Sequence, residues 1–177
     1  MANARNEQYD PESFTVYSMR ECINETLQRY TFKESQKEKI IFEDTMDFLS
    51  HGSSTLMTHV FFNLIKKSLY AIAVNTNKGD VHIRLASNER YNLIYIRDTA
   101  TGIEPLALPH IFEDFYTTKK TGESNNIGLG LAFCKTTLNT FGGSIECQSE
   151  YGSHTEFVLK LPTLYEHEIN EIKRSVH

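Results

Sequence analysis

The hydrophobic positions of this chain follow two different periods, and each period predicts one kind of element. Apolar residues recur at spacings of three and four from Thr58 to Val74, which predicts a helix. Apolar and polar residues alternate in the next two segments, Val81–Ser87 and Tyr91–Arg97, which predicts two strands. Only residues 88–90 separate these strands, so we expect them to form a hairpin.

Shorter patterns predict the remaining elements. Ser18 and Glu21 have the spacing of a capping box, so Ser18 is expected to begin a helix. Further expected helices span residues 18–30, 106–115, 127–141 and 166–175, further strands span 14–17, 39–43, 144–149 and 156–161, and residues 52–54 and 116–126 are expected to be loops.

Length and composition favour one domain. The chain has 177 residues, of which 40% are hydrophobic, and this is enough for a single buried core. We expect residues 13–162 to form that domain. Residues 1–12 are polar and are expected to be a linker or an expression remnant, and residues 163–177 are expected to be a C-terminal tail.

Charge and cysteine content exclude several classes. The net charge of −5 argues against nucleic-acid binding, because binding a polyanion needs a basic face. No apolar run approaches the roughly 20 residues of a membrane-spanning helix, so we expect a soluble, cytoplasmic chain without membrane contact, even if a longer parent protein sits in the inner membrane. Cys22, Cys134 and Cys147 are too far apart for a disulfide framework or a zinc site.

Two segments before the helix near residue 130 are candidates for binding phosphate. Gly128 and Gly130 leave backbone N–H groups open at a helix N-terminus, where the dipole favours an anion. The alternative is that these glycines only permit tight packing. The preceding loop is either a phosphate-binding lid or an ordinary solvated surface, and its hydroxyl and ammonium groups belong to Thr117, Thr118, Lys119 and Lys120.

Two polar features nearer the N-terminus are further candidates. Asp98 follows an apolar strand, where its carboxylate either accepts a hydrogen bond from an exocyclic amine such as that of adenine or caps a turn. Asn63 and Lys67 lie four residues apart on one face of the predicted helix, flanked by Lys66 and Tyr70. This face either meets a cleft or is a solvated stripe.

The order of these segments resembles the ATP-binding catalytic domain of sensor histidine kinases, whose fold is shared with gyrase, the Hsp90 chaperones and MutL in the GHKL superfamily. The resemblance covers roughly residues 59–162. Residues 114–117, 132–135 and 155–159 look similar to the quorum-sensing kinases that detect α-hydroxyketone autoinducers. The matching motifs are the N box at 59–72, the first glycine box at 98–103, the F box and start of the ATP lid at 111–120, the second glycine box at 126–131, and the closing segment at 152–157.

The resemblance implies a fold and a set of roles. The fold is an α/β two-layer sandwich, with a mixed, mostly antiparallel sheet covered on one face by about three helices and with ATP between helices and lid. Asp98 receives the adenine amine, Thr155 supports that contact through water, and Gly102 shapes the adenine pocket. The other implied nucleotide-binding residues are Asn63, Lys66, Lys67, Tyr70, Ile103, Thr117, Thr118, Lys119, Lys120, Gly128, Leu129, Gly130 and Leu131.

The chain departs from the family pattern at the N box. Lys67 stands where the family has the Asn that binds Mg²⁺, and an ammonium group has no lone pair for a cation. Ala100 and Asn126 also replace glycines of the two glycine boxes. Three hypotheses follow: the Lys67 charge replaces the ion, with metal-independent binding and impaired transfer; Asn63 and water still hold Mg²⁺; or the domain has lost its nucleotide and is an interaction module.

The family's reaction implies partners. It transfers the γ-phosphate of ATP to a His on a separate dimerisation domain and then to the Asp of a response-regulator receiver domain. None of the seven His residues lies in the acceptor context, so the resemblance implies a catalytic domain from a longer quorum-sensing kinase. A serine kinase of the anti-sigma type and a regulatory module without catalysis are the alternatives.

Overall fold

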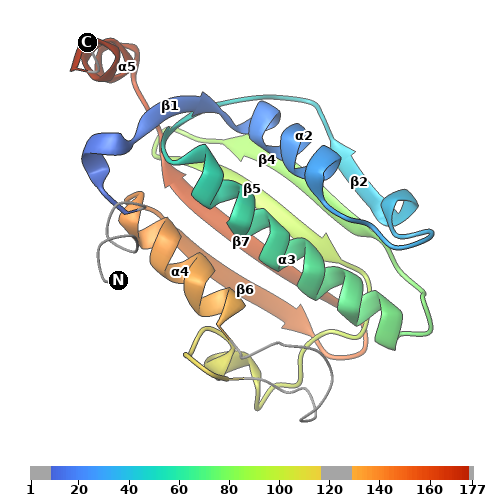
Figure 1. Cartoon of the computed structure of the whole chain (residues 1–177). Coiled ribbons are helices and arrows are strands. Elements are labelled where there is room, and N and C mark those ends of the chain that lie inside the picture. The colour runs from blue at the N-terminus through green and yellow to red at the C-terminus, as the bar shows by residue number, and fades with distance from the viewer. Residues whose placement is uncertain (1–8, 117–128, 176–177) are drawn as a thin grey trace, which may run out of the picture.

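The computed structural model describes residues 9–116 and 129–175, which form two layers, one of strands and one of helices (Figure 1). The main sheet has five strands in the order β2-β4-β5-β7-β6. β2 pairs with β4 in parallel, and every other neighbouring pair is antiparallel, so the predicted mixed sheet is confirmed. The strands are β2 (Ile40–Glu43), β4 (Val81–Ser87), β5 (Tyr91–Asp98), β6 (Ser144–Glu150) and β7 (His154–Pro162).

Helices α2 (Met19–Arg29), α3 (Ser54–Val74) and α4 (Gly130–Thr140) lie across one face of this sheet (Figure 1). This confirms the predicted one-sided cover. Two short strands, β1 (Thr15–Ser18) and β3 (Leu49–Gly52), form a separate antiparallel pair. The last helix, α5 (Glu166–Ser175), contacts β1 at the edge of the molecule and buries no residue.

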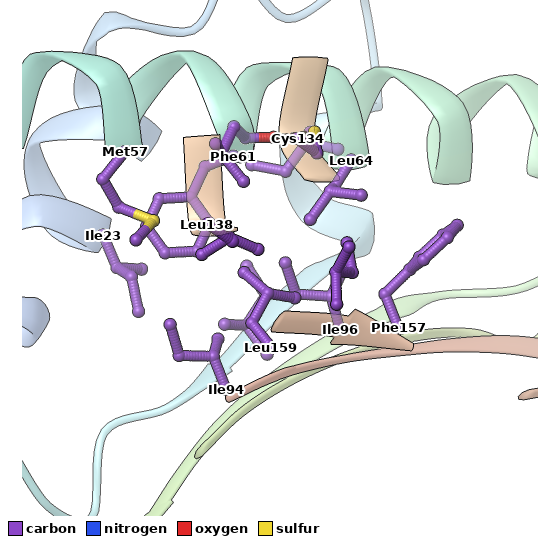
Figure 2. Packing of buried hydrophobic residues seen from close by; sticks show 14 of the residues in the cluster. Ile23, Met57, Phe61, Leu64, Ile94, Ile96, Cys134, Leu138, Phe157 and Leu159 are labelled. Atoms are coloured by element: carbon purple, nitrogen blue, oxygen red, sulfur yellow. Dashed lines mark hydrogen bonds between the residues drawn. The ribbon is translucent and has the colours of Figure 1, made fainter. Parts of the chain in front are cut away.

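The core lies between the helical layer and the sheet. In β5, every second residue is buried, among them Ile94 and Ile96. Phe61 and Leu64 of α3 point down from the helix onto these side chains (Figure 2). A strand presents alternate residues to one face and a helix presents every third or fourth residue, so both sequence periods are satisfied by the same interface.

The N-terminus of α2 is fixed by side chains of two segments. The Ser18 hydroxyl accepts a hydrogen bond from the Glu21 N–H at 3.1 Å, which confirms the predicted cap. The same hydroxyl donates to Asp47 Oδ2 at 2.7 Å, and the Arg20 N–H donates to Asp47 Oδ1 at 2.9 Å. The cap therefore also joins the helix to the loop before β3.

Replacing Ser18 with Ala is expected to lower the free energy of unfolding by about 1 kcal/mol, because the Glu21 N–H loses its partner. Urea denaturation measures the change. Asn24→Ala, at an exposed position within the same helix, is the control and is expected to change stability by less than about 0.5 kcal/mol. Equal effects of the two substitutions would contradict the cap.

Two predicted segments differ from the structure. The predicted helix at 106–115 is wrong: this segment consists of turns around the short 3₁₀ helix Leu108–His110, because Pro105 and Pro109 supply no backbone N–H. The loop predicted at 52–54 is also wrong, since Gly52 ends β3 by pairing with Thr15. Helix α3 consequently begins at Ser54, four residues before the predicted start.

The first described residues of the chain also pack against the domain. Tyr9 packs against the core, and its hydroxyl lies 3.5 Å from Thr137 Oγ1. Phe14 is buried edge-on against Phe141. The loop predicted at 116–126 lies outside the described residues from position 117 onward. Within the described ranges, no helix is both long and apolar enough to cross a membrane.

Candidate functional site

A cavity of about 470 Å³ opens between α3, the Asp98 end of β5, the start of β7 and the first turn of α4. Leu129 is 41% exposed and lies outside its lining. Thr117, Thr118, Lys119, Lys120 and Gly128 lie outside the described residues. The other predicted nucleotide-binding residues all line the cavity: Asn63, Lys66, Lys67, Tyr70, Asp98, Gly102, Ile103, Gly130, Leu131 and Thr155.

A second hollow is a weaker candidate for a ligand site. It measures about 270 Å³ and is more open than the cavity beside Asp98. Its lining includes Arg84, Arg97 and Glu156, which lie on the sheet face without helices. Because charged side chains that face water surround it, this hollow lacks the apolar walls of a small-molecule site.

Asp98 is the buried acid of the cavity. It ends β5, is 2% exposed, and accepts a hydrogen bond from the Ala100 N–H at 3.3 Å. Burial raises the pKa of Asp98 to about 6, although the Ala100 N–H, the Ser68 hydroxyl and the Lys67 ammonium each act to lower it. The carboxylate is therefore charged at neutral pH and still has unused acceptor capacity, which suits a ligand donor.

Ser68 was not predicted as a site residue, because its position follows the apolar period of α3. Its hydroxyl is buried and has no partner within hydrogen-bond geometry among the described residues. It is nevertheless close enough to Asp98 to influence the pKa of that carboxyl. A buried unpaired hydroxyl next to a buried carboxylate is a place where a ligand or a water molecule completes the hydrogen bonding.

A hydrogen-bond network fixes the turn that follows Asp98. Ser149 Oγ accepts from the Ile103 N–H at 2.8 Å and donates to the His154 carbonyl at 2.7 Å. It also lies 3.3 Å from Thr155 Oγ1. The turn is thus attached to the β6–β7 hairpin, and Thr155 stands directly opposite Asp98 in the pairing of β5 with β7.

Asn63 connects α3 to the start of α4. Its Nδ2 donates to the His59 carbonyl at 2.9 Å, which leaves Oδ1 toward α4. A Cβ at position 130 would lie 2.7 Å from that Oδ1, so glycine permits this close approach. No side chain of the described residues caps the first turn of α4, and its open N–H groups and dipole favour an anion beside Gly130.

Lys67 follows Asn63 by one helical turn and also lines the cavity. Burial lowers the pKa of the Lys67 ammonium below its ordinary value, while Cys147 and Asp98 act in the opposite direction. Burial also raises the pKa of the Cys147 thiol to about 12, so this cysteine is neutral at physiological pH. Of the two groups that raise the pKa of Lys67, Asp98 is therefore the charged one.

Sequence reasoning missed most of the apolar walls of the cavity, although it predicted Ile103 and Leu131. Whether a residue lines the cavity depends on which distant segment faces it. Two of the wall residues, Ala107 and Ile111, lie in the segment 106–115, which was wrongly predicted to be a helix. Val74 follows Tyr70 by one helical turn, and this spacing was the one available indication. The lining residues that were not predicted are Ala71, Val74, Thr101, Glu104, Ala107, Ile111, Tyr116, Tyr151 and Phe157.

The described residues offer little to a divalent cation. They contain no group of three or more His, Cys, Asp or Glu side chains placed to hold a metal. Asn63 supplies one amide oxygen, and the Lys67 side chain one turn away carries only donors. Mg²⁺ at a nucleotide site takes most of its six oxygen ligands from water and phosphate, so the protein's share here is the Asn63 oxygen, and the Lys67 ammonium on the same helix face opposes the ion.

A one-sided α/β sandwich with a cavity between its central helix and its strand ends is the architecture of an ATP-binding domain of the GHKL class. A family model described as "Histidine kinase-, DNA gyrase B-, and HSP90-like ATPase" matches residues 52–164. This match spans more than half of the chain, so the chain belongs to the histidine kinase-, DNA gyrase B- and HSP90-like ATPase family. The resemblance seen in the motifs is thereby confirmed.

Curated relatives refine this assignment. The chain is 37% identical over 164 residues to the CAI-1 autoinducer sensor kinase/phosphatase CqsS of Vibrio cholerae serotype O1, covering 92% of this chain and 23% of that protein. It is 32% identical over 155 residues to the autoinducer 1 sensor kinase/phosphatase LuxN of Vibrio campbellii, and this match covers 86% of this chain and 18% of that protein. The predicted similarity to autoinducer-sensing kinases is confirmed, and the chain spans about a fifth of the length of these relatives.

Solved structures confirm the fold. The catalytic domain of histidine kinase ThkA, in a nucleotide-free form, aligns with a TM-score of 0.69 at 23% identity, over 85% of this chain and 96% of that one. The mycobacterial sensor histidine kinase MprB aligns with a TM-score of 0.67 at 23% identity, over 83% of this chain and 95% of that one.

Proposed function

We propose that this chain is the catalytic domain of a two-component sensor kinase and binds ATP in the cavity beside Asp98. The main support is Asp98 itself, a buried carboxylate with unused acceptor capacity at the end of a cavity of nucleotide size. An adenine amine donates to this carboxylate, and Thr155 lies opposite to assist. Ile103, Ala107 and Ile111 supply apolar contacts for the purine.

The phosphates extend toward the first turn of α4 in this proposal. The open N–H groups at Gly130 and the helix dipole stabilise their charge. The bond between the γ-phosphorus and the β–γ bridging oxygen breaks, ADP leaves, and a P–N bond forms to an imidazole of a separate dimerisation domain. The chain's own residues contribute position and electrostatic stabilisation.

The partners follow from the same proposal. A dimerisation domain of the same parent protein supplies the acceptor His, since none of the seven His residues lies in an acceptor context. A response-regulator receiver domain then takes the phosphoryl group on Asp. The names of the two Vibrio relatives support an autoinducer as the signal of the parent kinase, and we place this domain in the cytoplasm.

Titration calorimetry with ADP is the direct test of nucleotide binding. We expect micromolar to millimolar affinity for ADP and at least about tenfold weaker binding of GDP, because guanine presents a carbonyl oxygen to the Asp98 carboxylate where adenine presents an amine. Absence of heat and of chemical-shift changes at saturating ADP would instead support the alternative, a regulatory module that has lost its nucleotide.

Adenosine binding is also expected to depend on pH. Below pH 6 the Asp98 carboxyl takes up its proton, loses its charge and turns one oxygen from an acceptor into a donor, so affinity falls by up to about tenfold for each further pH unit. Adenosine is the suitable probe because it carries no phosphate that titrates in this range. Protein NMR titrations at pH 7.5 and 5 measure the effect, and equal affinities at the two pH values would contradict the assigned contact.

A further inference from the structure

The triphosphate of ATP brings several negative charges into a cavity that has few positive ones. The cationic side chains of the described lining are Lys66 and Lys67, and the acidic ones are Asp98 and Glu104. Lys66 is exposed, whereas Lys67 is half-buried against the cavity wall. A charge held away from water acts more strongly on a ligand, so Lys67 is the stronger electrostatic partner.

Lys67 also has the correct place on its helix. It follows Asn63 by four residues, so both side chains lie on one face of α3. Asn63 in turn approaches Gly130 closely at the first turn of α4, where the open N–H groups favour phosphate. The Lys67 backbone therefore lies one helical turn from Asn63, and its side chain lines the same cavity within electrostatic range of Asp98.

The same arrangement opposes a divalent cation. Lys67 cannot ligate a cation, its charge repels one, and the described residues contain no acidic group of three or more to compensate. We propose that the Lys67 ammonium supplies the positive charge beside the phosphates, so that this chain binds ATP without a divalent cation. This inference rests on the proposed function, since it concerns the same cavity.

The ionisation of Lys67 agrees with this role. Without a ligand, burial lowers the pKa of Lys67, so the cavity holds the charge at some cost. Phosphate oxygens beside the ammonium raise its pKa again. Among the described residues, Cys147 and Asp98 are the titratable groups that act on the pKa of Lys67, and the Cys147 thiol stays neutral because burial raises its pKa to about 12.

Calorimetric titration of the whole chain with ATP, once in EDTA and once in Mg²⁺, tests the proposal. We expect dissociation constants within about threefold of each other. Binding at least about tenfold weaker in EDTA would overturn the metal-independent role of Lys67 while leaving ATP binding intact. Absence of binding in both buffers would refute the proposed function itself, so the two failures are distinguishable.

Variants at position 67 separate the charge from the structure. Lys67→Met is expected to weaken ATP binding in EDTA by at least about tenfold and adenosine binding by far less, provided that both are measured at pH 8, where Asp98 stays charged although it has lost the ammonium that lowers its pKa. Lys67→Arg keeps the charge and is expected to retain binding in EDTA. Lys135→Met, exposed on α4 and outside the cavity lining, is the matched control. Equal loss of ATP and adenosine affinity in Lys67→Met would overturn the proposal.

Discussion

Replacing Asp98 with Asn is expected to stabilise the unliganded chain and to weaken nucleotide binding strongly. Burial raises the pKa of Asp98 from 3.8 to about 6, so the folded state holds this charge at a cost of up to about 3 kcal/mol above pH 6. An uncharged amide removes that cost, and its oxygen can keep the hydrogen bond from the Ala100 N–H.

The stability gain has a defined pH dependence. As pH rises from about 4 to about 6, the unfolded chain releases the Asp98 proton while the folded chain retains it, so the folded wild type loses stability. The advantage of Asp98→Asn is therefore absent below pH 4 and complete above pH 6. Urea denaturation at pH 3.5 and pH 8 measures it, and a variant less stable than wild type at pH 8 would contradict the burial cost.

Nucleotide affinity is expected to change in the opposite direction. The side-chain amide introduced by Asp98→Asn turns a donor toward the adenine amine, so ADP binding weakens by at least about 100-fold. Asp44→Asn, at an exposed position outside the cavity lining and outside the family motifs, is the matched control and is expected to bind ADP as the wild type does. A stable Asp98→Asn chain with unchanged ADP affinity would disprove the adenine contact.

Replacing Gly102 with Ala is expected to cost at least about 3 kcal/mol of folding free energy. Gly102 has a φ of 65°, and a Cβ there would overlap the Glu150 carbonyl oxygen and lie 2.9 Å from the Tyr151 Cα. Both obstacles are backbone atoms of the β6–β7 hairpin and its turn. The turn after Asp98 must therefore move away from the hairpin.

Gly152→Ala measures the backbone strain without a steric clash, so the difference between the two variants gives the steric part of the Gly102→Ala effect. Gly152 has a φ of 85°, but a Cβ there would meet nothing within 4 Å. Its expected cost is therefore only the backbone strain, about 1–2 kcal/mol. Urea denaturation of both variants at pH 7 gives the comparison. Equal losses at the two positions would show that the close approach of Gly102 to the hairpin contributes nothing.

The elements that were predicted correctly are those with a strong local period. The helix around Phe61 and the two hairpins satisfy one apolar interface through periods of 3.6 and 2, and such periods are visible in sequence. The cap at Ser18 depends on two residues only three positions apart, so it could also be predicted from the sequence. Strand β3 was missed because its partner lies 37 residues away along the chain, at Thr15, and pairing of that range has no local pattern.

The features of the site fall into the same two groups, those predicted from sequence and those that depend on the fold. The sequence alone predicted the nucleotide-binding residues, including Asp98, Gly102 and the exceptional Lys67, because each stands in a recognisable order of motifs, and these three residues line the cavity. Only the tertiary structure decided that Ser68 stands unpaired near Asp98, which apolar residues form the walls, and how burial shifts the ionisation of Asp98 and Lys67. Burial and proximity arise when distant segments pack together, and no single segment contains them.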